Sequence, residues 1–439
     1  MIASLKRFLS SDLILKSSSS KLITFPINLI NLNLLIFVFS SSELAHFFLI
    51  EAISGVILSL LFSGQNTVFL KLLNENKVDG RTFILHSICT KSIYLFIGIV
   101  AISLLNFSGL PLKFAIFNEV EFFIFFLISC MAFGFLLDMF VFLSQYSLNR
   151  ERYFLNFLIQ ISPPIFIFLS IFTCYFFYLD IYNFVFLRLL LIIPILIFSC
   201  LLIYNSSRRF GQFKLLKFFK RVFFIQYPLI LSGFFSSLTS ALPILIFGYI
   251  NNKEIMIVLG FLERGYTLLK NGIISLTYNL YPYYFKNVEN IEKLEDLLIQ
   301  ASKNLRIVSF LMISLSIPFY ITFSIQSEIE FSYFYLVIFI LRFSQIPLIL
   351  DLMLVNIYYH LEERTVFLSW LGILGSSIKS LNLFAQEDGL LWVILIFYLA
   401  SFSQLIISLI DKKDLHRFVR RTYVNTTLTG LVLLAALFV

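Results

Sequence analysis

The sequence predicts an all-α polytopic membrane protein with about twelve transmembrane helices. Three observations support this fold class. The chain of 439 residues is 59% hydrophobic and only 13% charged, apolar runs of about 20 residues recur along its length, and its positive charges concentrate in alternate loops. Runs of that length cross a hydrocarbon core of about 30 Å. Because lipid offers no hydrogen-bond partners, continuous apolar runs must cross it as helices.

The predicted spans follow one another with short loops between them. They cover residues 22–40, 44–70, 83–105, 121–147, 154–178, 182–204, 223–250, 255–285, 305–325, 331–358, 365–385 and 389–410. The first run is longer than the core of a signal peptide, so we expect it to be an uncleaved span. The apolar stretch Leu431–Val439 is short for a span. We expect it to lie in the membrane interface, with a thirteenth span as the alternative.

The basic residues predict the orientation. Of 33 Lys and Arg, 25 fall in loops or at span ends on one predicted side, 6 lie deeper inside spans, and only Lys113 and Lys253 fall on the other side. The side poor in cations carries nine acidic residues. The positive-inside rule places the basic loops, and with them the N-terminus, in the cytoplasm. Since the net charge of +8 comes from loops beside spans, membrane lipid is the expected partner, and nucleic acid is not.

The spans divide into two sets of six. The predicted parts are an N-terminal six-helix bundle at 1–205, a basic amphipathic cytoplasmic linker at 206–221, a C-terminal six-helix bundle at 222–411, and a basic tail with a short apolar end at 412–439. At an offset of 213 residues, Leu137–Asp138 matches Leu350–Asp351. Because six is even, such a repeat would be parallel, about an axis along the membrane normal.

Ten Asp, Glu, Lys and Arg residues lie inside predicted spans and away from the span ends. The cations are Lys91, Arg188, Arg264, Lys270, Arg342 and Lys379, and the acids are Glu51, Asp138, Glu263 and Asp351. Each costs about 2.5–3.5 kcal/mol or more at a helix centre, so each should face protein or a water-filled cavity. Pairing with the acids is one explanation of the cations, and snorkelling is another for Arg188 and Lys379. Because six cations cannot all pair with four acids, we expect the six to form a cavity that binds an anionic substrate.

Three carboxylates are candidates for coupling to an ion gradient. They are Asp138, Asp351 and Glu51. A carboxylate held inside a span can take up and release a proton, or it can hold a neighbouring cation. No HExxH, CxxC or Walker A motif occurs in the sequence. We therefore expect no catalytic or metal-binding residues, no enzymatic activity, and no cofactor other than an H⁺ or Na⁺ gradient.

Several local segments resemble one transporter family. They are SLLFSGQNTVFLKLL (Ser59–Leu73), QYPLILSGFF (Gln226–Phe235), LGFLERGYTLLKNG (Leu259–Gly272) and NLYPYYFK (Asn279–Lys286). Together with twelve short-looped spans in two sixes, long fourth and tenth spans and intramembrane cations, they resemble the polysaccharide (O-antigen or capsule type, Wzx-like) flippases. These belong to the multidrug/oligosaccharidyl-lipid/polysaccharide (MOP) exporter superfamily, with its MATE-like fold. The resemblance covers about residues 5 to 415 and rests on the pattern of spans and charges more than on identical residues.

The resemblance implies a function. Members of this family move an undecaprenyl-pyrophosphate-linked oligosaccharide from the cytoplasmic to the outer leaflet of the bacterial inner membrane, where it is used to build lipopolysaccharide and other surface polymers. A polysaccharide polymerase and a chain-length regulator are the implied partners. The alternatives are a multidrug or small-molecule exporter of the same superfamily and a polysaccharide polymerase. The polymerase is less favoured because its large external loop is missing from the predicted topology.

Overall fold

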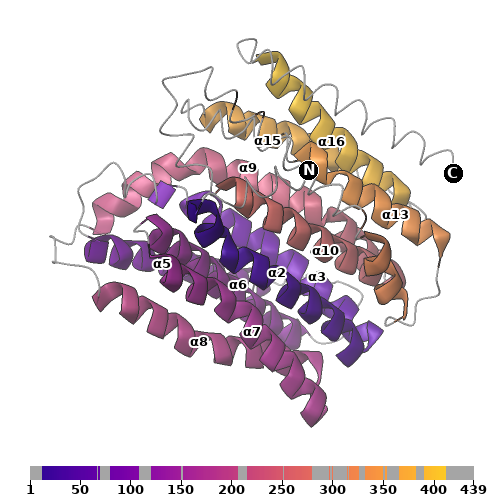
Figure 1. Ribbon diagram of the computed structural model, residues 1–439, viewed down its shortest axis with the longest axis horizontal. Coiled ribbons are helices and arrows are strands. Elements are labelled where there is room, and N and C mark those ends of the chain that lie inside the picture. Colours follow the sequence, from indigo (N-terminus) through magenta and orange to yellow (C-terminus); the bar gives the residue numbers. More distant parts are fainter. Residues whose placement is uncertain are drawn as a thin grey trace. The chain divides into compact units, whose positions relative to one another are not determined.

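The computed structural model is built almost wholly of helices in the part of the chain that it describes. The described residues are 12–66, 68–69, 80–107, 120–149, 152–205, 215–250, 252–278, 316–325, 332–349, 365–381 and 390–411, with single positions at 296, 299, 314 and 352. Figure 1 shows the helices in chain order. Their bounds are α2 Asp12–Val38, α3 Ser41–Phe62, α5 Gly80–Phe107, α6 Val120–Asn149, α7 Tyr153–Phe177, α8 Ile181–Asn205, α9 Leu215–Ile250, α10 Lys253–Tyr278, α13 Tyr333–Ser344, α15 Thr365–Lys379 and α16 Leu390–Asp411.

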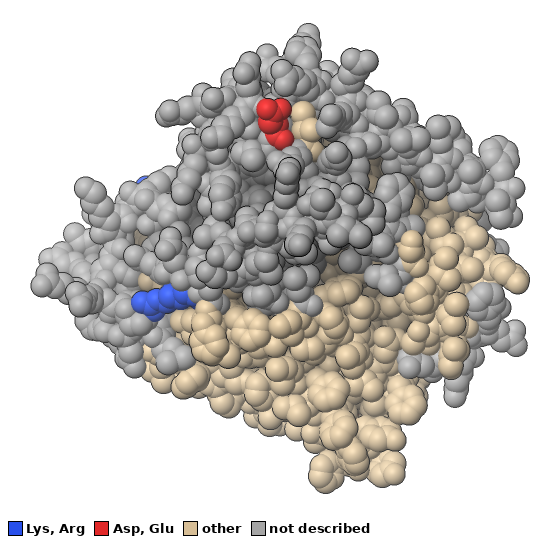
Figure 2. Space-filling view, in the orientation of Figure 1, with Lys and Arg blue, Asp and Glu red and all other residues tan. Residues whose placement is uncertain are grey.

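Each of the twelve predicted spans contains helix in the described residues. The ninth holds a shorter apolar helix, Ser316–Ile325. Six described helices are long and apolar enough to cross a membrane: Ser41–Phe62, Phe123–Ser147, Phe154–Phe177, Ile181–Leu201, Leu229–Tyr249 and Leu390–Ser408. Large apolar side chains stay exposed on these helices, such as Phe154 and Phe177, which suits contact with lipid. Figure 2 shows one face, on which most of the described surface carries neither acidic nor basic residues.

The chain forms two compact units. One contains Val38–Met256, and the other contains Met1–Phe37 together with Ile257–Val439. Contacts group α9 with helices that precede it in the chain. The predicted linker at 206–221 is described only from Leu215, where it is already part of α9. The two six-helix bundles, the linker and the basic tail stay predictions about the organisation of the chain.

In the Val38–Met256 unit, α3 and α9 pack closely at a break in the first of them. Helix α3 ends at Phe62, and Gly64 adopts a φ of 74°, which glycine reaches without strain. The buried Gln226 of α9 donates a hydrogen bond to the Ser63 carbonyl at 2.9 Å. A Cβ on Gly233 would lie 1.8 Å from Ser63 Oγ. The break therefore joins two segments that the sequence singled out, Ser59–Leu73 and Gln226–Phe235.

In the other unit, an aromatic cluster fixes α10. The Phe261 ring stacks on the rings of Phe319 and Phe323, with both centroid separations at 4.5 Å. A Cβ on Gly265 would lie 2.4 Å from the Phe319 ring, so the glycine permits this close approach. Helices α15 and α16 also pack together, and Gln404 donates a hydrogen bond to the Leu371 carbonyl at 2.7 Å. This packing positions the helices that carry the charged residues described next.

Candidate functional site

The predicted site residues lie on helices of both units. Helices α3, α5, α6 and α8 carry Glu51, Lys91, Asp138 and Arg188, and helices α10, α13 and α15 carry Arg264, Lys270, Arg342 and Lys379. Asp351 lies outside the described residues, so its predicted match to Asp138 is not described. Among the described residues, the charged side chains of each unit interact with one another within that unit.

Lys91 and Asp138 form a buried ion pair. The Lys91 ammonium donates a hydrogen bond to Asp138 Oδ2. The side chain of Lys91 is 0% exposed, whereas that of Asp138 is 23% exposed. Asn66, just beyond the α3 break, donates to Asp138 Oδ1 at 2.8 Å. The rings of three phenylalanines surround the ammonium within 6 Å, which adds cation–π stabilisation. They are Phe62, Phe69 and Phe142.

Arg188 and Glu51 form a second pair of the same kind. Arg188 Nη1 donates to Glu51 Oε1 at 2.8 Å, and Arg188 Nη2 contacts the Cys130 thiol at 3.4 Å. The guanidinium carbon lies 4.0 Å from the centroid of the Phe133 ring. Because the Arg188 side chain is only 4% exposed, it does not reach the membrane interface by snorkelling. Of the two sequence-based explanations for Arg188, pairing is the one that the structure supports.

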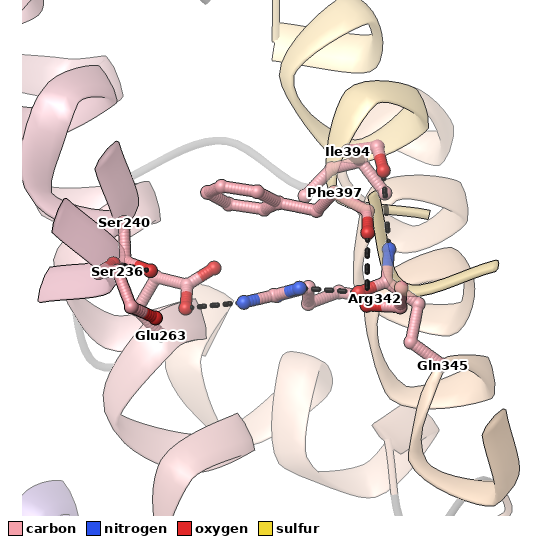
Figure 3. Close-up of polar contacts among 8 residues, drawn as sticks. Ser236, Ser240, Glu263, Arg342, Gln345, Ile394 and Phe397 are labelled. Carbon is pink, nitrogen blue, oxygen red and sulfur yellow. Dashed lines mark hydrogen bonds and ion pairs between the residues drawn. The ribbon is translucent and has the colours of Figure 1, made fainter. Parts of the chain in front are cut away.

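A third pair, in the other unit, joins Arg342 to Glu263. Arg342 Nη2 donates to Glu263 Oε2 at 2.6 Å. Arg342 Nη1 is bonded to Gln345 Oε1, and Gln345 Nε2 donates to the Ile394 carbonyl at 3.1 Å. Figure 3 shows Arg342 extending across to Glu263, with Gln345 and Ile394 at its base. The arginine is therefore held at two points, by a carboxylate on α10 and by an amide fixed to α16.

Two aromatic rings complete the surroundings of Arg342. The centroid of Tyr266 lies 3.8 Å from its guanidinium carbon and that of Phe397 lies 4.5 Å from it. The same rings contact two further cations, since Lys270 is 5.5 Å from Tyr266 and Lys379 is 5.6 Å from Phe397. Arg342 and Glu263 act electrostatically on both lysines. We call Arg342, Lys270, Lys379 and Glu263 the cation cluster.

The cation cluster gathers three of the six predicted cations around one carboxylate. Each cation disfavours the others in a low-dielectric surrounding, so the arrangement favours a negative ligand. Arg264 lies next to Glu263 on α10 and is partly buried, about 100° around the helix from it. Lys91 and Arg188 are neutralised in the other unit. Among the described residues, the structure thus gathers four of the predicted cations in α10, α13 and α15.

Four residues of this site were missing from the predicted set. Glu263 was counted as an intramembrane acid only, and Tyr266, Gln345 and Phe397 were not singled out. A signal for part of the set exists in the sequence: Glu263, Tyr266 and Lys270 are spaced by three and four residues, which places them on one face of a helix. Phe397 on α16 has no comparable signal, because its role depends on packing between helices.

No protein-family model matches the chain, and no curated protein matches it. Solved structures do. The lipid II flippase MurJ in an inward closed conformation matches with a TM-score of 0.67 and 14% identity, covering 95% of this chain and 92% of that chain. Two structures of a multidrug resistance MATE family transporter of the MOP superfamily also match. The inward-facing one has a TM-score of 0.62, 14% identity and coverage of 91% and 99%, and the outward-facing one has 0.61, 15%, and 95% and 98%.

At these identities the likeness shows the fold alone. The prediction of an all-α polytopic membrane protein with a MATE-like fold is confirmed, and the chain is a multi-pass membrane protein with the fold that the lipid II flippase MurJ and MATE transporters of the MOP superfamily share.

Proposed function

We propose that this protein is a flippase. Its substrate would be an oligosaccharide repeat unit linked to undecaprenyl pyrophosphate, moved from the cytoplasmic to the outer leaflet of the bacterial inner membrane for assembly of a surface polysaccharide. The protein would act without covalent chemistry on the substrate. A polymerase and a chain-length regulator would use the product. The lipid II flippase among its structural neighbours gives a precedent for a lipid-linked cargo on this fold.

The observation that carries the proposal is the cation cluster. Each cation inside a membrane protein is costly, and a hydrophobic side chain of similar size would avoid the cost. Three cations around Glu263 are therefore best explained by a ligand that supplies negative charge. The diphosphate of a lipid-linked sugar is such a ligand, because its two phosphate groups are anionic and sit at the membrane surface. Arg342 suits it especially, since a guanidinium binds phosphate oxygens through a planar fork.

Coupling to an H⁺ or Na⁺ gradient is a further part of the proposal. Asp138, Glu51 and Asp351 are its candidate carboxylates. Asp138 and Glu51 are each more exposed than the cation they bind, 23% and 29% against 0% and 4%, so each is the more reachable partner for an ion. Replacing Asp138 and Asp351 together with Asn tests this, with Lys91→Met added so that the buried Lys91 charge is not left without its partner. Transport that still responds to the proton gradient in this variant would exclude these two carboxylates.

The decisive experiment is deletion of the gene in its host. Lipid-linked intermediates are measured by mass spectrometry, together with their accessibility from each leaflet. Single repeat units trapped in the inner leaflet, with surface polymer lost, are the expected result. Single units that reach the outer leaflet unpolymerised would instead indicate a polymerase. Complementation with the wild-type gene should restore the polymer, whereas the Arg342→Gln gene should not.

A multidrug or small-molecule exporter is the second candidate, because the MATE structures of the same fold are described as multidrug resistance transporters. This candidate predicts unchanged surface polymer after deletion, together with increased sensitivity to toxic compounds. The charge of the site separates the two candidates further. A carrier for cationic drugs should keep its activity when Arg342 is neutralised, whereas a carrier for a diphosphate should lose it.

A further inference from the structure

We propose that Glu263 is a displaceable internal counter-ion. It would hold Arg342 while the site is empty and give way to a diphosphate when substrate binds. The inference rests on the proposed function, since it specifies how the cation cluster receives its ligand. It assigns Glu263 a role in selecting the ligand, as a carboxylate that competes with it for the same guanidinium.

The first argument is that the pair is joined by one hydrogen bond only. Glu263 Oε2 accepts from Arg342 Nη2 at 2.6 Å. Within the described residues, Glu263 Oε1 and Arg342 Nε are buried and have no hydrogen-bond partner. Strong pairs between guanidinium and carboxylate use two parallel hydrogen bonds. Both partners therefore keep unused hydrogen-bonding capacity, and a ligand that offers two oxygens to Nε and Nη2 would bind Arg342 better than Glu263 does.

The second argument is that Arg342 does not depend on Glu263 for its position. Gln345 binds its Nη1, and the Ile394 carbonyl holds Gln345. The rings of Tyr266 and Phe397 lie against the guanidinium. When Glu263 leaves, these contacts keep the guanidinium in place. Glu263 is more exposed than Arg342, with side chains 20% and 8% accessible, so the carboxylate is the partner that has room to withdraw.

The third argument concerns the class of ligand. A monocarboxylate would only replace one carboxylate with another at Arg342. A diphosphate carries charge on two phosphate groups, so it can bind Arg342 while it also attracts Lys270 and Lys379, which share the rings around it. The hydroxyl of Tyr266 is buried and has no hydrogen-bond partner within the described residues, and it can donate to a phosphate oxygen. These extra contacts favour a diphosphate over a monoanion.

The consequence is a site whose affinity is limited by its own carboxylate. Removing the charge of Glu263 removes the competitor and leaves Arg342 available. Glu263→Gln should therefore bind the diphosphate more tightly and release it more slowly. A carboxylate that merely stabilised the fold would not produce this gain in affinity. The gain is thus the signature that separates the two roles.

The experiment measures binding of inorganic pyrophosphate to the full-length protein in nanodiscs by calorimetry. Glu263→Gln should lower the Kd at least tenfold, and it should slow transport in proteoliposomes. Glu254→Gln is the matched control, because Glu254 is exposed at the start of the same helix. It should leave the Kd unchanged. Glu263→Asp, which keeps the charge on a shorter side chain, should give an intermediate Kd and serves if the Gln variant unfolds.

The outcomes separate this inference from the proposed function. If Arg342→Gln binds pyrophosphate as well as the wild type does, the anion site itself is wrong and the proposed function loses its support. If Arg342→Gln loses pyrophosphate binding but Glu263→Gln does not tighten it, the proposed displacement of Glu263 by the ligand is wrong, and the proposed anion site stands. Equal tightening for inorganic phosphate and pyrophosphate would overturn the preference for a diphosphate. Thermal unfolding of each variant confirms that the comparison is made on folded protein.

Discussion

The two compact units bury charge in different ways. In Val38–Met256, Lys91 and Arg188 each have one carboxylate and a surrounding of phenylalanine rings. In the other unit, three cations share one carboxylate, and the rings between them are partly tyrosine. A cation paired directly with a carboxylate is suited to a structural role, whereas several cations gathered at one carboxylate are suited to binding. Buried charge alone therefore does not identify a site, because its local balance decides the role.

The largest effect should come from breaking the pair of Lys91 and Asp138. Asp138→Asn leaves the Lys91 ammonium buried without its counter-charge, and loss of one partner of a buried pair costs about 3–5 kcal/mol. We expect a large fall in the thermal unfolding temperature in detergent, with poor recovery of folded protein. The matched variant Lys91→Met with Asp138→Leu removes both charges and should regain most of the loss. Normal stability of Asp138→Asn would show that the pair is not structural.

A smaller loss is expected where α9 crosses the break in α3. Gly233→Ala places a Cβ 1.8 Å from Ser63 Oγ, and overpacking of this kind costs about 1–3 kcal/mol. Gly55→Ala is the control, because no atom lies within 4 Å of the added Cβ there. It should be neutral or slightly stabilising. Equal unfolding temperatures for the two variants would mean that the close approach of α3 and α9 contributes nothing to stability.

These two predictions also mark what sequence reasoning could reach. The twelve spans follow from apolar run lengths, since lipid dictates helices of that length. The ten intramembrane charges follow from the positions of Lys, Arg, Asp and Glu within those apolar runs. Which cation meets which acid does not follow, because Lys91 and Asp138 are 47 residues apart and Arg188 and Glu51 are 137 apart. Those pairings depend on how helices pack, and one sequence contains no record of that.

The same limit explains the prediction of a single cationic site. Six cations against four acids suggested one anion-binding cavity, because the count does not show how the charges are distributed. The structure balances two cations within Val38–Met256 and gathers three in the other unit. The role of Lys91 and Arg188 in substrate binding stays a prediction. The break at Ser63–Gly64 could be suspected from the glycine, but its contact with Gln226 could not.

The next effect concerns function more than stability. Arg342→Gln removes the guanidinium from the cation cluster and should weaken pyrophosphate binding more than tenfold, which corresponds to more than about 1.4 kcal/mol. Its unfolding temperature should fall less than that of Asp138→Asn, because the Glu263 left behind is 20% exposed. Arg342→Lys should recover little binding, since an ammonium cannot form the planar fork. A variant that is unstable yet binds normally would assign Arg342 to the same structural class as Lys91.

The smallest effect is expected at the edge of the cation cluster. Lys270→Gln and Lys379→Gln each remove one charge that acts on the ligand across several ångströms, so each should weaken pyrophosphate binding only a few-fold at about 0.1 M salt. The double variant should lose roughly the product of the two factors and should respond less to added salt, because fewer charges remain to be screened. Lys253→Gln, an exposed cation at the start of α10, is the control for a general change in charge. If Lys253→Gln weakens pyrophosphate binding as much as Lys270→Gln does, the net charge of the protein attracts the ligand, and the cation cluster contributes no specific binding.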